Sequence, residues 1–261
     1  MFGLSVKSIG QNNLADDGKC DIVDGIRRGL DREYKDWKSP SGTHMVPDSL
    51  PSKQSNKGST AEKVIYDLLH QCGTQRKEPM FVVHSFVFSE HIPDSGRQKS
   101  WVMGETDFVI IHKNHGPILI QVKATDTGKS HKEAEKQLQK DKLALQMRFE
   151  KAMEGELSKR KVKELFTYIP AFVAMPNCPR PPELCAHDNA LYQEDCSSLE
   201  GFDRWWNDKV GTAKHPDVSP EMYECLVIRY APLLLLFLIF SCILLLVVIS
   251  RSSGSWPKLP N

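Results

Sequence analysis

The chain has 261 residues and a formal net charge of +1, and 40% of its residues are hydrophobic. This length and apolar content allow one ordinary domain with extensions, and the near-neutral charge excludes a global field that attracts nucleic acid. Seven cysteines in a chain of this length do not make a disulfide scaffold. Any binding of nucleic acid must therefore come from a local basic patch.

The N-terminal part, residues 1–56, is predicted to be an extension and a linker. Residues 1–37 are charged and mixed, with one short helix expected near residues 24–37. Residues 38–60 are rich in Pro, Ser and Gly, which is typical of linkers. The first residues contain no apolar stretch of the signal-peptide kind, so we expect no signal peptide.

Residues 57–180 are predicted to form the folded domain. Its first element is a helix capped by Ser59 or Thr60, with apolar residues at helical spacing and an end near Gly73. Three segments rich in β-branched and aromatic residues then predict strands, over residues 80–90, 106–113 and 116–124. The last two strands are separated by a short turn at "NHG", which predicts a hairpin.

A long helix over residues 131–153 and a strand over residues 165–175 complete the predicted domain. The hairpin strands pair antiparallel, whereas the last strand can pair parallel because it follows a crossover helix. The element order helix, three strands, helix, strand therefore predicts an α/β fold with a mixed sheet.

Four side chains are expected to meet at one corner of this hairpin. Asp107 begins one strand, and Gln121 and Lys123 lie two apart on its partner, so the latter two point to the same face. With a turn near residues 113–116, Asp107 falls opposite Gln121 to Lys123. Glu62, on the preceding helix, can reach the same corner.

These residue types suit metal-dependent hydrolysis of a phosphodiester. Asp107 is the natural carboxylate ligand for Mg²⁺ or Mn²⁺, and the Gln121 amide oxygen and a backbone carbonyl near Val122 would add neutral hard ligands. Such an ion polarises the phosphate and activates water, while Lys123 positions that water or stabilises the developing negative charge. Glu62 would hold a metal-bound water or a second ion.

The stretch "GETDFVII…GPILIQVKAT", residues 104–125, resembles the Asp…(Asp/Glu)-x-Lys signature of the PD-(D/E)XK nuclease superfamily, and within it the nuclease-related domain called NERD. The preceding "GSTAEKVIYDLL" resembles the helix that carries the early glutamate of that family, which falls on Glu62. The resemblance covers about residues 57–176 and includes the element order. It implies a restriction-endonuclease-like core and a Mg-dependent nuclease ancestry, with the site formed by Glu62, Asp107, Gln121 and Lys123.

The sequence departs from the family pattern at Gln121, where the family has Asp or Glu. A carboxamide can give an oxygen to a metal ion but carries no negative charge, so the site should hold the ion more weakly. Two interpretations stay open. The domain is either a Mg²⁺- or Mn²⁺-dependent hydrolase of nucleic acid, or a catalytically inactive nuclease fold that serves as a binding module or adaptor on a membrane surface.

A basic stretch follows the hairpin. Across residues 129–164, Lys and Arg number eleven and Asp and Glu seven, and the densest part holds Lys159, Arg160 and Lys161. This triplet favours a contact with a phosphate backbone or, as readily, a solvated helix face.

Cysteines and a histidine offer a rival site beyond the domain core. The side chains with zinc-ligand chemistry are Cys178, Cys185, His187 and Cys196. Their spacing lacks the tight C-x2–4-C knuckle of structural zinc sites. We therefore do not expect zinc.

The C-terminal part is predicted to hold a stalk and a membrane anchor. Residues 181–229 are rich in Pro, Asp and Trp and suggest an irregular appendage or stalk, with one short helix expected at "FDRWW", residues 202–206. The segment from Ala231 to Ser250 has no charged side chain, and about 20 such residues suffice to cross a bilayer. We therefore expect a single-pass transmembrane helix over residues 230–250, a short tail over 251–261, a membrane as partner and the main domain in the cytosol. The sequence indicates no particular protein partner.

Overall fold

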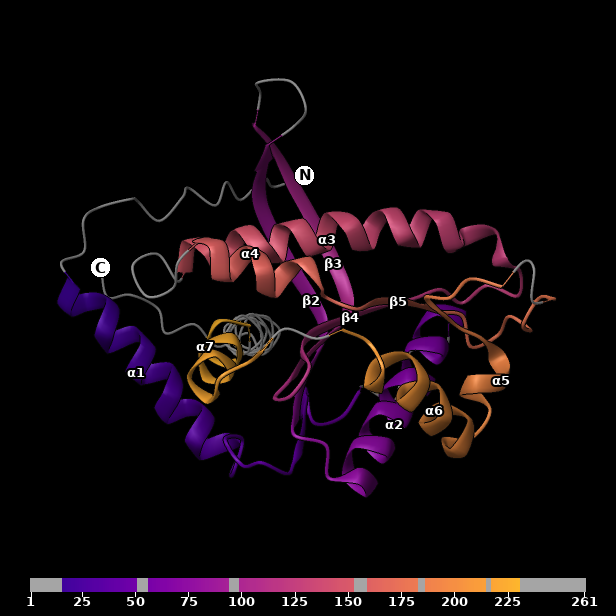
Figure 1. The fold of residues 1–261 in the computed structure, drawn as a ribbon, viewed down its shortest axis with the longest axis horizontal. Coiled ribbons are helices and arrows are strands. Elements are labelled where there is room, and N and C mark those ends of the chain that lie inside the picture. The colour runs from indigo at the N-terminus through magenta and orange to yellow at the C-terminus, as the bar shows by residue number, and fades with distance from the viewer. Residues whose placement is uncertain are drawn as a thin grey trace, which may run out of the picture.

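The computed structural model describes residues 16–50, 56–93, 99–152, 159–182, 186–214 and 217–230. Its centre is a six-stranded sheet whose strands lie side by side in sequence order (Figure 1). Strands β2, β3 and β4 pair antiparallel, and the other neighbours pair parallel. The strands are β1 (Thr43–Val46), β2 (Met80–Pro93), β3 (Lys99–His112), β4 (Gly116–Val122), β5 (Ala171–Ala174) and β6 (Ala190–Leu191).

Helices cover both faces of the sheet (Figure 1). One face carries α1 (Asp16–Glu33), α3 (His131–Ala152), α4 (Lys159–Thr167) and α7 (Pro220–Tyr230). The opposite face carries α2 (Lys57–Arg76), α5 (Gln193–Cys196) and α6 (Leu199–Trp206). Short turns flank two of these helices, η1 (Gly128–Ser130) before α3 and η3 (Asn207–Gly211) after α6.

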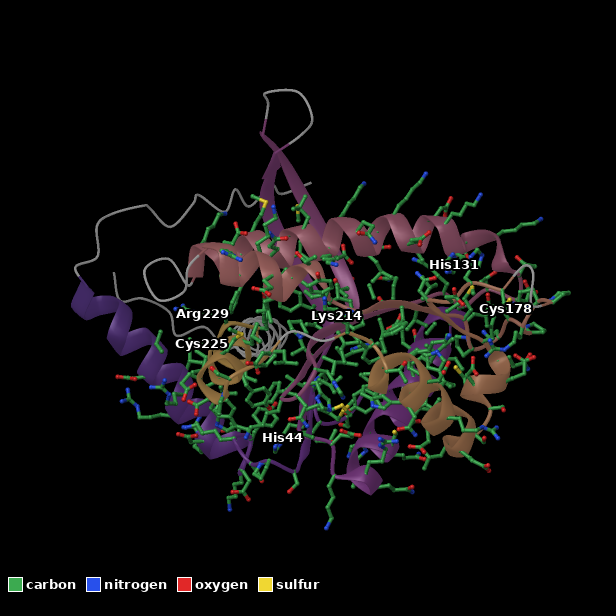
Figure 2. The ribbon with its side chains drawn as sticks, in the orientation of Figure 1. His44, His131, Cys178, Lys214, Cys225 and Arg229 are labelled. Carbon is green, nitrogen blue, oxygen red and sulfur yellow. The ribbon has the colours of Figure 1, made fainter. Side chains whose placement is uncertain are left out.

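Each face of the sheet has its own hydrophobic core, and the central strands supply both. Val109 and Ile111 of β3 pack toward α3 and α7, whereas Phe108 and Ile110 pack toward α2 and α6. Side chains fill the space between the helices and both faces (Figure 2). Because β4 is buried at every position, the hairpin must lie at the centre of the sheet, as its nearly continuous apolar sequence predicts.

The start of α2 lies earlier than its sequence indicates. Asn56 is the N-cap, and its side chain accepts a hydrogen bond from the Ser59 backbone N–H at 2.8 Å. The helix also continues past Gly73 to Arg76. A Cβ atom at Gly73 would collide with Met80 and Thr43, so the glycine allows close packing against the sheet instead of ending the helix.

Strands β2 and β3 extend well beyond the predicted hairpin segments and project from the body as a two-stranded ribbon (Figure 1). Their register runs from Met80 opposite His112 to Pro93 opposite Lys99. Asp107 was expected to begin a strand, yet it lies well inside β3. The predicted strand start was therefore wrong. The polar residues between Lys99 and Asp107 do not have the apolar pattern of a strand, although β3 includes them.

Along the ribbon, the regular alternation of side chains between the α2 face and the α3 face is reversed at one position. Ser85 has a φ of 52°, which is unusual for a residue other than glycine. Before this step His84 faces α2, whereas after it Phe86 belongs to the core on the α3 side. The same change occurs on β3, where Phe108 packs toward α2 and Thr106 bonds to α3. The ribbon thus presents its apolar side to α3 only because the chain turns over here.

The predicted fold needs correction at its C-terminal end. No helix in the described part of the chain is long and apolar enough to cross a membrane. The last described helix, α7, ends at Tyr230, and the predicted span from Ala231 to Ser250 lies outside the described residues. The transmembrane helix is therefore not supported, and the fold class is corrected to a mixed α/β fold with a six-stranded sheet.

Three further segments differ from expectation. Residues 165–167 continue α4, so the strand begins only at Ala171. Residues 43–46, expected in a linker, pair with β2 at the sheet edge. The expected stalk contributes β6 and helices α5 to α7 to the body, because its aromatic residues bury at helical spacing, namely Phe202, Trp205, Trp206, Tyr223 and Tyr230.

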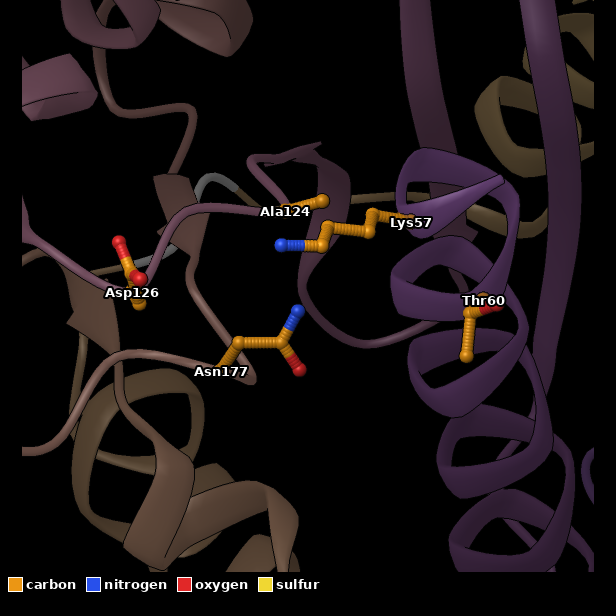
Figure 3. A pocket seen from close by; sticks show the side chains of 5 residues that line it. All are labelled: Lys57, Thr60, Ala124, Asp126 and Asn177. Carbon is orange, nitrogen blue, oxygen red and sulfur yellow. The ribbon is translucent and has the colours of Figure 1, made fainter. Parts of the chain in front are cut away.

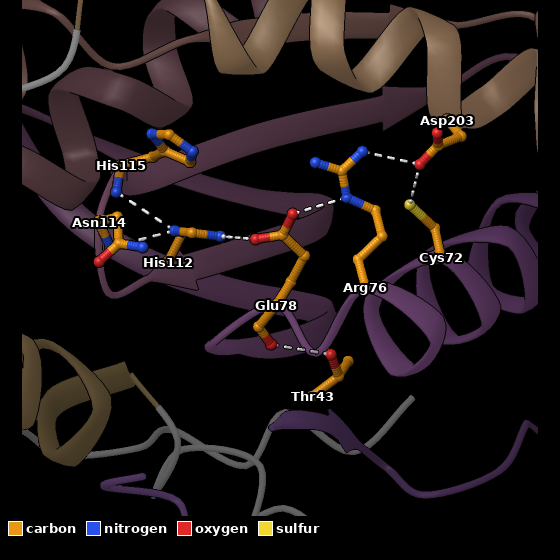
Figure 4. Close-up of polar contacts among 8 residues, drawn as sticks. All are labelled: Thr43, Cys72, Arg76, Glu78, His112, Asn114, His115 and Asp203. Atoms are coloured by element: carbon orange, nitrogen blue, oxygen red, sulfur yellow. Dashed lines mark hydrogen bonds and ion pairs between the residues drawn. The ribbon is translucent and has the colours of Figure 1, made fainter. Parts of the chain in front are cut away.

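A polar network connects the buried His112 of β3 with Glu78 and Arg76 at the end of α2 (Figure 4). The Glu78 carboxylate accepts from His112 Nε2 at 2.9 Å and from Arg76 Nε at 2.7 Å. His112 Nδ1 accepts from the backbone N–H groups of Asn114 and His115, which fixes Nε2 as the donor to Glu78. The hydrogen bond from His112 is the main cause that lowers the pKa of Glu78 to about 2.

Replacing Glu78 by Gln should destabilise the protein at neutral pH. Because the folded-state pKa lies below the ordinary value of 4.5, the carboxylate stabilises the fold above about pH 4.5 and loses this effect as the pH falls toward 2. We expect a loss of roughly 1–3 kcal/mol at pH 7 that shrinks toward pH 2, measured by urea unfolding. The exposed Glu200→Gln is the control, and equal stability of both variants at pH 7 would contradict the prediction.

Candidate active site

Asp107 lies where β3 and β4 separate. The paired register of these strands ends at Phe108 opposite Ile120. Beyond that pair the Val122 backbone N–H donates to Asp107 Oδ2 at 2.6 Å. The aspartate side chain thus takes the place of a backbone partner, and it lies opposite Gln121 as the sequence predicts.

Gln121 is held by the same carboxylate. Its Nε2 donates to Asp107 Oδ2 at 2.6 Å, while its Oε1 is buried and has no hydrogen-bond partner among the described residues. Exchanging the two amide atoms would leave the nitrogen unpartnered instead, so either assignment leaves one buried polar atom without a partner. Such an atom is costly in a folded protein, and it makes the Gln121 amide a candidate ligand for an ion or a substrate.

The Asp107 carboxyl is poised to change its charge near neutral pH. The residue is 9% exposed, and burial is the main cause that raises its pKa to about 7. The Val122 N–H and Lys123 oppose this shift, and the charges of Glu62 and Glu105 reinforce it. A positive ion beside the carboxylate would reverse the cost of burying it.

Lys123 is anchored by α3. Its Nζ donates to Gln137 Oε1 at 3.4 Å, and Gln137 Nε2 donates to the backbone oxygen of Glu105 at 2.8 Å. Lys123 also lies close enough to lower the pKa of Asp107 and of Asp141. The lysine therefore stands beside the candidate carboxylate, and Gln137 sets its position.

Glu62 is already engaged on the α2 side of the sheet. Its Oε2 lies 3.1 Å from His84 Nε2, and His84 packs on the ring of Phe108. Its charge still reaches Asp107, whose pKa it raises. The structure therefore puts Asp107 and Gln121 in direct contact, whereas Lys123 contacts α3 and Glu62 contacts His84 on the α2 side, and the charges of both act on Asp107.

Two polar residues beside the site were not singled out from the sequence. Thr106 Oγ1 donates to Asp141 Oδ2 at 2.9 Å, and both residues are fully buried. Burial raises the pKa of Asp141 to about 6. The signal in the sequence is that Asp141 interrupts the apolar stripe of α3 between Leu138 and Leu145.

A cavity of about 350 Å³ lies at the carboxyl ends of β4 and β5. Lys57 of α2 extends into it toward Asn177, Ala124 lies beside the Lys57 side chain, and Asp126 lies on the far side (Figure 3). Ala124 directly follows Lys123 in the chain. This edge of a sheet is where α/β proteins commonly bind ligands.

The other predicted residues are not joined to this site. Lys159, Arg160 and Lys161 open α4, and the described hydrogen bonds of the site reach β3, β4 and α3 instead. Cys178 and Cys196 are buried, and Cys185 lies outside the described residues. Cys178 and His131 lie at the same end of the molecule (Figure 2).

The site fits a divalent cation in part. Asp107 offers a carboxylate whose Oδ1 accepts no hydrogen bond among the described residues, and Gln121 offers an unpartnered oxygen. The described residues contain no group of three or more His, Cys, Asp or Glu side chains arranged to hold a metal. One carboxylate and one amide would leave most of the coordination to water and substrate, as Mg²⁺ often permits.

Replacing Asp107 by Asn should stabilise the metal-free protein at alkaline pH. Because the folded-state pKa is raised from 3.8 to about 7, the folded state holds a proton that the unfolded state has lost, and stability falls as the pH rises through this window. At pH 8 we expect a gain of roughly 1–3 kcal/mol over the native chain, vanishing near pH 4. Urea unfolding at both pH values measures it, with the exposed Asp67→Asn as control. A variant less stable than the native chain at pH 8 would show that the carboxylate is stabilising.

Comparison with known proteins does not assign a function to this chain. The chain matches no family model, no curated protein and no solved structure. The likeness to PD-(D/E)XK nucleases therefore consists of the short motif and the element order. What the site does has to be inferred from how Asp107, Gln121 and Lys123 are placed.

Proposed function

We propose that residues 57–176 form a nuclease-like domain that hydrolyses phosphodiester bonds of nucleic acid with Mg²⁺ or Mn²⁺. The observation that carries this proposal is the buried pair of Asp107 and Gln121, which leaves one amide atom without a partner among the described residues, together with Lys123, whose charge acts on Asp107. The helix that carries Glu62 and the order of the following strands support it. So does the raised pKa of Asp107, since carboxylates with strongly shifted pKa values are frequent in catalytic sites.

Each residue has a separate task in this reaction. A bound divalent cation supplies the positive charge that polarises the phosphate and activates water. Asp107 and Gln121 give the oxygen ligands, and the Val122 N–H holds the carboxylate in place. Lys123 stabilises the negative charge that grows on the phosphate, and Gln137 keeps its ammonium group in position.

A catalytically inactive binding module is the second candidate. The hydrogen bond from Gln121 to Asp107 favours it, because an amide can satisfy the buried aspartate without any metal. The single negative charge would then bind a divalent ion too weakly for catalysis. In this case the domain would bind nucleic acid and release it uncut.

Cleavage assays on the full chain separate the two candidates. With Mn²⁺ we expect cutting of DNA or RNA by the native chain, no cutting by Asp107→Ala, and a rate lower by about 100-fold for Lys123→Ala. The matched controls are Asp67→Ala and Lys63→Ala, an exposed ion pair on α2. Equal cutting by the native chain and all four variants would mean a contaminating nuclease and would refute hydrolysis at this site.

The Gln121→Glu variant tests the role of the missing charge. A second carboxylate should strengthen Mn²⁺ binding and raise the cleavage rate at limiting Mn²⁺, each by about tenfold. A native chain that does not cut, together with a variant that does, would identify the domain as the binding module. No change in metal affinity on this substitution would place the ion elsewhere.

A further inference from the structure

A cavity of about 420 Å³ lies between α3 and the projecting ribbon. Gly104 in its wall is only three residues from Asp107 on the same strand. Gln137 in the opposite wall bonds to Lys123 and to the backbone of Glu105. The cavity therefore lies next to the candidate active site, with Gln137 as the residue that contacts both.

The rim of this cavity is cationic. Lys136 and Lys140 line it, and both are exposed one helical turn apart on α3. Glu133, also exposed, is the one carboxylate on the rim among the residues described there. Exposed lysines of this kind serve as point charges for phosphate groups.

The depth of the cavity is polar and buried. Asp141 is 1% exposed, and Thr106 is its described hydrogen-bond donor, at Oδ2. A carboxylate in this position accepts hydrogen bonds from amino groups, as aspartate does from the amino group of cytosine. Both amide atoms of Gln137 are already engaged, so Asp141 is the group that can recognise a ligand.

The ribbon wall of the cavity is apolar, formed by Phe88, Met103 and Gly104. The Phe88 ring covers Gly104 so closely that a Cβ atom there would collide with it. Met103 is 77% exposed beside this pair. A planar ring can lie against such a wall, because sulfur and aromatic groups make favourable contacts with π-systems.

We propose that this cavity binds the nucleotide next to the scissile phosphate, with its phosphates on Lys136 and Lys140 and its amino-bearing base against Asp141. The proposal rests on the proposed function and names its substrate as single-stranded nucleic acid. In a duplex the base is paired and stacked, so its edge cannot reach a buried carboxylate, whereas an unpaired base can enter a concave site. Bases with an exocyclic amino group are preferred over thymine and uracil.

Fluorescence anisotropy of the full chain in EDTA tests this without any cleavage. The probes are a labelled deoxycytidine decamer, a deoxythymidine decamer and a duplex of equal length. We expect the deoxycytidine decamer to bind at least tenfold more tightly than the duplex and several-fold more tightly than the deoxythymidine decamer. The double variant Lys136→Ala/Lys140→Ala should weaken binding of both decamers at least tenfold and lower the salt slope by about one to two. The control is Lys151→Ala, an exposed lysine at the other end of α3.

Asp141→Asn should abolish the preference for deoxycytidine and leave binding of the deoxythymidine decamer unchanged. Its thermal unfolding is compared with that of the native chain, and if it fails to fold the lysine variant decides. Equal or tighter binding of the duplex, or unchanged binding by the lysine variant, overturns the proposal. Cleavage without a single-strand preference would refute this inference alone, whereas selective binding without cleavage would refute only the hydrolysis.

Discussion

The packing of the ribbon and the position of the candidate site both depend on the reversal of side-chain faces at Ser85 and Asp107. A non-glycine residue in the left-handed region costs of order 1 kcal/mol, and Ser85 adopts it in the middle of a strand. The step turns the outer half of the ribbon over, so that Phe86 and Phe88 pack with the α3 side while His84 stays with α2. Without it, these aromatic side chains would point away from α3.

The same step falls opposite Asp107 on the neighbouring strand. The residue lies at the changeover between faces, where β3 and β4 part, and its carboxylate bonds to Gln121 and Val122. Burial makes the charge on Asp107 costly, and the Gln121 oxygen has no partner among the described residues. A costly buried charge and an unpartnered amide oxygen at one point of a well-packed sheet both lower stability. Such local destabilisation is typical of functional sites.

The sequence predicted the pairing but not the geometry around it. Asp107 opposite Gln121 follows from counting back from a short turn, since β pairing has a fixed period. The change of faces at Ser85 could not be predicted, because no glycine or proline marks it. The partners of Glu62 and Lys123, which are His84 and Gln137, come from elements distant in sequence. Helix α6 includes the short helix expected at residues 202–206, whereas α7 was missed because its buried aromatic residues stand among polar ones.

Proton release on metal binding tests the central claim most directly. Calorimetric titration of Mn²⁺ into the full chain at pH 7, in two buffers of different ionisation enthalpy, measures the ion stoichiometry and the protons displaced together. Because the pKa of Asp107 is about 7, we predict one ion per chain with about half a proton released, and neither with Asp107→Asn. Unchanged binding by that variant, or no binding by the native chain, would contradict a cation site at Asp107 and Gln121.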